Sequence, residues 1–190
     1  QYVPYNDLLT SVSIDTLEGI TKIVEVKPQR GSYVSLVNMA LIEESLFMRS
    51  TLEAAVTKIA CDIATKEQLA QLEENLTLQE FYLSKNNLDK IMELDNAFHE
   101  FMYKITNKMQ CYYMVRTMNI HYDRFRELRL HTSNPDIIVT EHKRILEAMM
   151  EKDSEKAKDL CIAHLNRLHL DAEEVMKKVK KAMKLDYFEN

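Results

Sequence analysis

Residues 86–106 read NNLDKIMELDNAFHEFMYKIT, and this stretch decides the fold. Apolar residues recur in it at intervals of three and four, which is the period of an amphipathic helix. The predicted buried stripe consists of Leu88, Met92, Asp95, Phe98, His99, Met102 and Ile105. Two polar residues of this stripe, Asp95 and His99, are four positions apart, and side chains at that spacing leave the same face of a helix. The stretch therefore predicts a helix that turns a carboxylate and an imidazole toward the core.

The rest of the chain after residue 35 has the same helical character. From residue 32 to residue 190 there is no glycine, and Pro135 is the one proline. A sheet of that length would need turn residues that tolerate positive φ, so helix is the economical interpretation. The apolar periodicity and the capping residues predict helices at about 37–64, 66–83, 86–106, 109–131, 136–151 and 154–184. Short connections make neighbours antiparallel, so we expect an all-α fold, an antiparallel bundle of about six to seven helices over residues 36–190.

A different pattern precedes the helices. Residues 23–27 and 32–35 alternate apolar and polar side chains, and Pro28 to Gly31 supply turn residues between them. This pattern predicts a small β-hairpin. From these residues alone, the hairpin would be a cap on the helical bundle.

Composition narrows the function classes. The chain has 190 residues, of which 46% are hydrophobic and 29% charged, as in ordinary globular proteins. No apolar run is long enough to cross a bilayer, and no signal peptide is evident. A net charge of −5 argues against a chain that holds nucleic acid by itself. Three isolated cysteines, Cys61, Cys111 and Cys161, favour a reducing compartment, so we expect a cytoplasmic protein.

Two further predicted helices carry histidines on their apolar stripes. His142 lies on the helix at 136–151, and His164 lies on the helix at 154–184. A single core histidine is usually satisfied by a hydrogen bond, but three imidazoles and one aspartate in one core are costly unless they share a partner. One divalent cation satisfies all four, with zinc favoured and nickel or manganese as alternatives. The remaining histidines, His121, His131 and His169, are expected at the surface or behind the ligands.

Arg49 interrupts the apolar stripe of the first predicted helix. That stripe consists of Ile42, Leu46, Leu52, Val56, Ile59 and Ile63. A guanidinium facing the core needs an anion. Two interpretations stay open: an internal salt bridge to Glu44 or Glu53, or a fork that holds the carboxylate of a ligand beside the metal.

Several segments together resemble one known family. Residues 44–60 resemble the opening helix of the FCD domain, the effector-binding half of FadR-type GntR regulators. Residues 95–99 look like its D-x-x-F-H motif, and residues 141–148 look like its E-H-x-x-I-L-x-A motif. Asn107 falls between two helices as in the family, and Asp153 to His164 resembles the pattern of its last helix. The order and spacing agree over about residues 40–175.

The resemblance implies a function as well as a fold. Asp95, His99, His142 and His164 would be metal ligands, and Arg49 and Arg126 would contact an effector that is a small organic acid. Residues 23–34 are similar to the wing of a GntR winged helix, in which Arg30 would touch DNA. About 35 residues precede the helical part, too few for a whole winged helix, so residues 1–35 are expected to be part of one.

The resulting hypothesis is a ligand-responsive bacterial regulator of transcription that acts as a homodimer on operator DNA. We expect it to be a binding protein and not an enzyme, because no nucleophile or general base accompanies the predicted ligands. The alternatives are a mononuclear metal-dependent helical hydrolase and a structural bundle without a ligand. A di-iron protein of the ferritin type is excluded, because no histidine has a glutamate three positions earlier.

Overall fold

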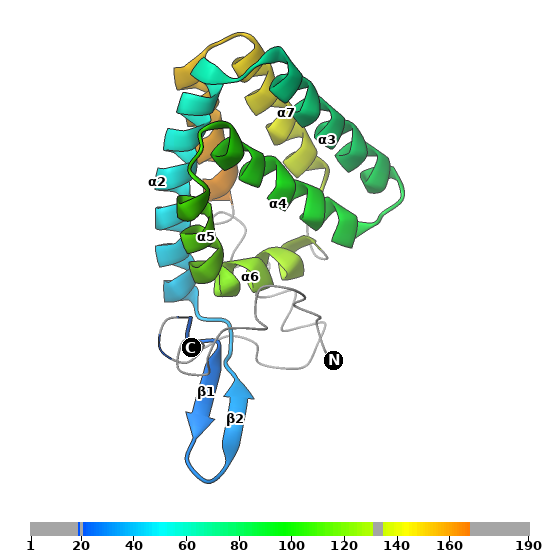
Figure 1. The fold of residues 1–190 in the computed structure, drawn as a ribbon. Coiled ribbons are helices and arrows are strands. Elements are labelled where there is room, and N and C mark those ends of the chain that lie inside the picture. Colours follow the sequence, from blue (N-terminus) through cyan, green and yellow to red (C-terminus); the bar gives the residue numbers. More distant parts are fainter. Residues whose placement is uncertain (1–18, 20, 131–134, 168–190) are drawn as a thin grey trace.

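The computed structural model describes residue 19 and residues 21–130 and 135–167. Within these residues, a two-stranded hairpin precedes a bundle of seven helices (Figure 1). The strands are β1 (Val24–Lys27) and β2 (Gly31–Val34). The helices are α2 (Met39–Ile63), α3 (Lys66–Ser84), α4 (Leu88–Ile105), α5 (Met109–Met118), α6 (Ile120–Leu130), α7 (Asp136–Met150) and a helix over residues 154–167. The predicted all-α fold with a small hairpin is confirmed; the predicted continuation beyond residue 167 lies outside the described residues.

Side-chain caps fix where several helices begin. Asn38 Oδ1 accepts from the N–H of Leu41 at 3.1 Å before α2, and Asn87 caps α4 in the same way. Thr65 and Gln68 form a capping box at the start of α3. Asp153 Oδ1 accepts from the N–H of Lys156 at 3.0 Å, which starts the helix over residues 154–167 where the sequence predicted a cap.

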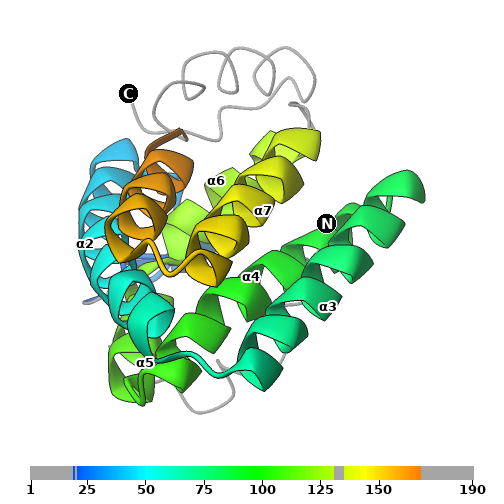
Figure 2. The same ribbon diagram turned by 90° about the horizontal axis from the view of Figure 1, so that it is seen from above.

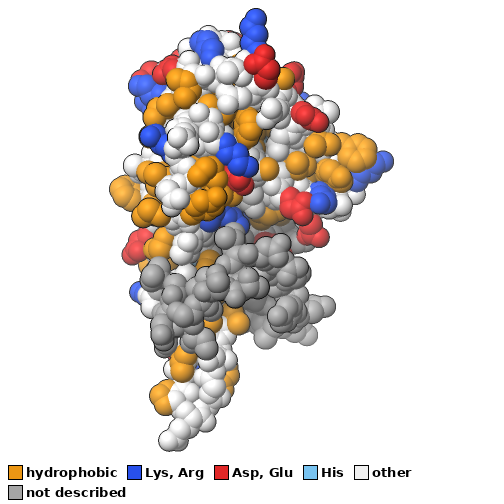
Figure 3. All heavy atoms as spheres, in the orientation of Figure 1, with side chains coloured by type: hydrophobic (Ala, Val, Ile, Leu, Met, Phe, Trp, Pro, Cys, Tyr) orange, Lys and Arg blue, Asp and Glu red, His pale blue; other side chains and the backbone are white. Residues whose placement is uncertain are grey.

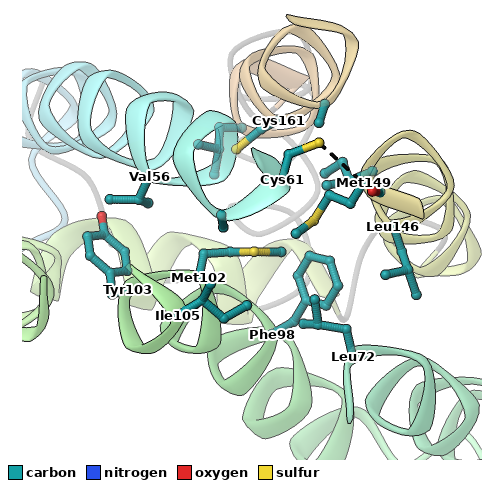
Figure 4. Close-up of a cluster of buried hydrophobic side chains, with 14 of the residues drawn as sticks. Val56, Cys61, Leu72, Phe98, Met102, Tyr103, Ile105, Leu146, Met149 and Cys161 are labelled. Atoms are coloured by element: carbon teal, nitrogen blue, oxygen red, sulfur yellow. Dashed lines mark hydrogen bonds between the residues drawn. The ribbon is translucent and has the colours of Figure 1, made fainter. Parts of the chain in front are cut away.

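The helices pack around α4. It lies between α2 and α3, and α7 packs against α3 and α2, as the view from above shows (Figure 2). The hydrophobic core fills the space between these helices and includes Phe98, Met102 and Leu146 (Figure 4). Because α4 is surrounded on several sides, its polar residues Asp95 and His99 are buried, each 4% exposed. The packing thus forces these two groups to find partners inside the bundle.

The prediction of a single helix over residues 109–131 was wrong. The structure divides this segment into α5 and α6 at Asn119, which is 2% exposed. The N–H of Asn119 donates to Val115 at 3.0 Å and ends α5, while its carbonyl accepts from Asp123 at 2.7 Å and starts α6. With neither glycine nor proline there, the break follows from packing: α6 crosses the end of the bundle (Figure 1), and Phe125 becomes fully buried.

The predicted stripe of the first helix was wrong in its second half. Ile42, Leu46 and Val56 are buried, but Ile59 is 37% and Ile63 54% exposed. The buried face continues instead through small residues, Ala60 and Cys61, both 0% exposed. Small side chains let α2 approach α7 closely, and Cys61 Sγ lies 3.8 Å from the carbonyl oxygen of Ala148.

The hairpin has a regular antiparallel register. Val24 pairs with Val34 and Lys27 with Gly31, and the N–H of Arg30 donates to Lys27 at 2.9 Å to close the turn. Gly31 has φ +108, a value that L side chains rarely adopt. Arg30 is exposed in this turn, and the hairpin extends away from the helices (Figure 1).

The structure also bears on the cysteines and on membrane insertion. The three cysteines are free thiols, and Cys61 and Cys161 are buried. Among the described helices, none combines the length and the apolar character needed to span a bilayer.

Candidate metal centre

Four polar side chains meet inside the bundle, and they are the four that the sequence singled out. Asp95 and His99 come from α4, His142 comes from α7, and His164 comes from the helix over residues 154–167. One ligand atom from each lies within 4.8 Å of the others. Residues separated by up to 69 positions in the chain therefore share one small volume.

The three imidazoles point the same nitrogen at one another. The Nε2 atoms of His99 and His164 are 3.3 Å apart, those of His142 and His99 are 3.3 Å apart, and those of His142 and His164 are 3.2 Å apart. Asp95 Oδ1 lies 3.6 Å from His142 Nε2 and completes the group. Two ligands about 2.0–2.1 Å from a tetrahedral zinc ion would be about 3.3–3.4 Å apart. The observed spacing fits such an ion.

The other ring nitrogen of each histidine faces a buried acceptor. His99 Nδ1 lies 2.7 Å from Glu53 Oε2, His142 Nδ1 lies 3.0 Å from Gln79 Oε1, and His164 Nδ1 lies 3.0 Å from Glu141 Oε2. The hydrogen bonds to Gln79 and Glu141 place the ring hydrogen of His142 and His164 on Nδ1, and the nearby carboxylate of Glu53 favours the same tautomer of His99. Each Nε2 then presents a lone pair to the centre of the cluster, which is the form that binds a metal ion.

Asp95 divides its two oxygens between two partners. Oδ1 faces the imidazoles, while Oδ2 accepts from Arg126 Nη2. Arg126 also donates to Asp123 and Asn96, at 3.1 and 3.0 Å. The guanidinium therefore holds the carboxylate in place without occupying the oxygen that faces the cluster.

The electrostatics favour neutral imidazoles at His142 and His164 and a charged carboxylate at Asp95. Burial lowers the pKa of His142 well below its usual value, and the neighbouring His164 lowers it further. Burial also lowers the pKa of His164, against the opposing hydrogen bond to Glu141. Burial alone would raise the pKa of Asp95, but Arg126 and the nearby imidazoles hold that pKa far below its usual range. These are the protonation states that metal ligands need.

A cavity opens beside the cluster. Asp95 and His164 form part of its wall, together with Arg49, Tyr122 and Arg126. The rest of its lining consists of Arg129 and the apolar side chains of Ile91, Met92, Leu130 and Ile138. The lining therefore combines cationic and apolar side chains, which are the groups that a small organic anion would contact.

Arg49 forms an internal salt bridge, which was one of the two roles predicted for it. Its Nε lies 2.5 Å from Glu53 Oε1, so the internal salt bridge is formed with Glu53 and not with Glu44. The guanidinium also lies over the ring of Tyr122, 5.1 Å from the centroid, and lines the cavity. Arg49 thus makes the internal ion pair and also lines the cavity.

His121, expected at the surface or behind the ligands, is buried against backbone groups near the hairpin instead. His121 is 2% exposed and bonds to backbone groups near the hairpin, accepting from Asn38 N–H at 3.3 Å and lying 3.1 Å from the Thr21 carbonyl oxygen. His131 and His169 lie outside the described residues.

Sequence reasoning did not identify the acceptors behind the imidazoles. Glu53 was considered only as a partner of Arg49, and Glu141 only as part of a motif. Gln79 was not considered, although a signal was present: it follows Leu69, Leu72 and Leu76 at helical spacing on an otherwise apolar stripe. A fully buried glutamine on such a stripe indicates a specific hydrogen-bond partner.

The fold and the cluster define a class of protein: a helical ligand-binding domain whose core holds three histidines and an aspartate beside a cationic cavity. The model of the FCD domain family matches residues 44–167. The chain belongs to the FCD family, and the resemblance to FadR-type GntR regulators is confirmed.

Known relatives agree with this assignment. The transcriptional repressor RspR of the helix-turn-helix type from Escherichia coli K12 is 29% identical over 147 residues, which cover 77% of this chain and 64% of the relative. A regulator of the same type in an unstable DNA locus of Streptomyces ambofaciens is 28% identical over 156 residues, covering 80% and 64%. The chain thus spans 64% of the length of these relatives. Both relatives are named as regulators of transcription, and neither name is that of a hydrolase.

Solved structures share the fold. The E. coli protein McbR/YncC superposes with a TM-score of 0.70 at 19% identity, covering 83% of this chain and 79% of that one. A GntR protein from Streptococcus agalactiae gives a TM-score of 0.58 at 19% identity, covering 82% and 77%. At such low identity the similarity concerns the fold alone.

Proposed function

We propose that the protein is the sensor part of a homodimeric GntR-type repressor or activator in the bacterial cytoplasm. Its helical part, residues 36–190, binds a divalent metal ion of the zinc type through Asp95, His99, His142 and His164. A small organic acid then binds beside the metal, with its carboxylate against Arg49 and Arg126. Residues 1–35 belong to the winged helix through which the intact protein binds operator DNA, with Arg30 of the wing at the backbone or minor groove.

One observation carries the proposal: three Nε2 lone pairs and a carboxylate oxygen converge in a buried volume. Lone pairs 3.2–3.3 Å apart repel one another unless a cation lies between them. Cis ligands of an octahedral ion at about 2.1 Å would be about 3.0 Å apart, so the wider spacing favours a tetrahedral, zinc-like ion.

Charge supports the choice of an anionic effector. Three arginines, Arg49, Arg126 and Arg129, line the cavity; Arg49 is paired with Glu53, and Arg126 with Asp95 and Asp123. A divalent ion would add two positive charges to this set. An organic acid whose carboxylate contacts both metal and guanidinium would offset them.

The contacts of helix α6 support an effect of ligand binding on the hairpin. One face of α6 carries Tyr122 and Arg126, which line the cavity. The other face carries Arg124, whose Nη1 donates to the Ser35 carbonyl at 3.0 Å, and His121, which contacts the backbone of Thr21. A ligand that repositions Arg126 would therefore bias the segment that joins the hairpin to the bundle.

An exposed apolar face supports the homodimer. Phe47 on α2 is 74% exposed, and Tyr113 and Met114 on the adjacent α5 are 49% and 65% exposed. Hydrophobic side chains gather over this part of the molecule in Figure 3. Exposed apolar side chains on neighbouring helices fit a self-complementary interface in a regulator of this class.

Metal analysis and a binding screen test the proposal. We expect one zinc-type ion per chain by mass spectrometry of the purified protein, and a carboxylate probe such as citrate should bind more tightly with metal than without. A chain that contains no metal, and whose thermal unfolding is unaffected by zinc, nickel and manganese, would refute it.

A further inference from the structure

Gln79 is a fully buried amide in the C-terminal half of α3, with 0% of its surface exposed. Both ends of the amide are satisfied: Oε1 lies 3.0 Å from His142 Nδ1, and Nε2 donates to Asn75 Oδ1 at 2.7 Å. Of the three groups behind the imidazoles, it is the amide, whereas Glu53 and Glu141 are carboxylates. A carboxylate offers an acceptor whichever way it turns, but an amide offers an acceptor only in one of its two orientations.

The orientation of this amide is set by a backbone carbonyl. Asn75 Nδ2 donates to the carbonyl of Leu94 at 3.1 Å. A carbonyl can only accept, so Nδ2 of Asn75 must face it and Oδ1 must face Gln79. Gln79 then has to donate through Nε2, which leaves Oε1 toward His142. The carbonyl belongs to α4, the helix that also carries Asp95 and His99.

We infer that Gln79, held by Asn75, is a positioning residue that fixes the tautomer of His142 needed to bind the metal; this inference rests on the proposed function. With Oε1 against Nδ1, the ring hydrogen lies on Nδ1 and the Nε2 lone pair faces the cluster. We call this chain of hydrogen bonds, from the Leu94 carbonyl through Asn75 and Gln79 to His142, the relay. Each group in it fixes which atom of the next group donates and which accepts.

Reversal of the amide would favour the metal-free protein. Nε2 of Gln79 would then donate to Nδ1 of His142, and the ring hydrogen would move to Nε2. There it would donate to His164 or His99, whose Nε2 atoms are 3.2 and 3.3 Å away. That hydrogen bond would stabilise the empty cluster and would have to break before a cation could bind. The relay prevents this competing state.

Zinc affinity of four variants tests the relay, measured by competition with a chromophoric chelator. Gln79→Leu should bind zinc about 10–100-fold more weakly, the usual effect of losing a partner of a ligating histidine, and Asn75→Leu about tenfold more weakly. Gln79→Glu keeps an acceptor against Nδ1 in either orientation but sets its other oxygen against Asn75 Oδ1, so it should bind zinc more tightly than Gln79→Leu and more weakly than the parent. Gln71→Leu is the matched control, since Gln71 is exposed on the same helix, and it should bind like the parent.

A readout that does not need metal accompanies the titration. In nitrogen-15 spectra of the metal-free protein, His142 should carry its hydrogen on Nδ1 in the parent, and a population with the hydrogen on Nε2 should appear in Asn75→Leu. Lower stability in urea with unchanged zinc affinity and unchanged tautomer would show that Gln79 is merely structural and would overturn the inference. A parent that binds no zinc would refute the proposed function, while the spectra would still decide whether the relay sets the tautomer.

Discussion

Removal of two imidazoles from different helices should abolish the metal site. In the double variant His142→Ala and His164→Ala, the remaining groups of the cluster are Asp95 and His99, both on α4. Two neighbouring ligands on one helix no longer connect α4 to α7 or to the helix over residues 154–167. We therefore expect the variant to lose both the metal and the stabilisation that the metal gives to the bundle.

The size of the effect follows from linkage. A ligand present at 100 times its dissociation constant stabilises the folded state by about 2.7 kcal/mol. In a protein of this length, 1 kcal/mol changes Tm by about 2–4 °C. Zinc at that excess should raise the Tm of the parent by about 5–11 °C. The same addition should leave the Tm of the double variant unchanged.

The assay compares thermal unfolding with and without zinc in each protein. The comparison uses the rise in Tm that zinc causes, and not the Tm of the metal-free protein. The two substitutions by themselves also leave cavities and unpaired acceptors at Gln79 and Glu141, which lower the metal-free Tm. His121→Ala is the matched control: it deletes an equally buried imidazole that lies outside the cluster. The reasoning is refuted if the double variant retains one metal ion per chain and the full rise in Tm.

Three other perturbations test separate parts of the structure. Arg49→Met should cost about 3–5 kcal/mol in urea unfolding, because it leaves Glu53 charged and buried without its guanidinium; unchanged stability would show that the ion pair is not needed. The metal-free protein should lose stability as the pH falls below about 6.5, because burial lowers the pKa of His142 and His164 in the folded chain and the unfolded chain then binds more protons; a flat profile between pH 8 and 5.5 would contradict this. Arg124→Ala should speed hydrogen exchange in residues 31–35 about tenfold, because it removes a hydrogen bond that contributes about 1.4 kcal/mol. Equal exchange rates in variant and parent would show that α6 does not couple the cavity to the hairpin.

Much of the fold could be predicted because helix formation leaves a local signal. The spacing of apolar residues over 86–106 and the absence of glycine after residue 31 are sufficient to predict helices and their approximate bounds. The polar residues that interrupt these stripes also follow from periodicity, since a side chain on a buried face has to point inward. This is why the four members of the cluster could be named before their distances were known.

The tertiary structure decided whatever depends on contacts between distant segments. The division at Asn119 arises because α6 packs across the end of the bundle, and no local residue signals it. The acceptors behind the imidazoles come from α2, α3 and α7, so their pairing with particular histidines depends on how the helices are placed. Periodicity determines which face of a helix is buried; only the packing of one helix on another determines which atoms meet there, because each hydrogen bond requires two groups to lie within about 3 Å.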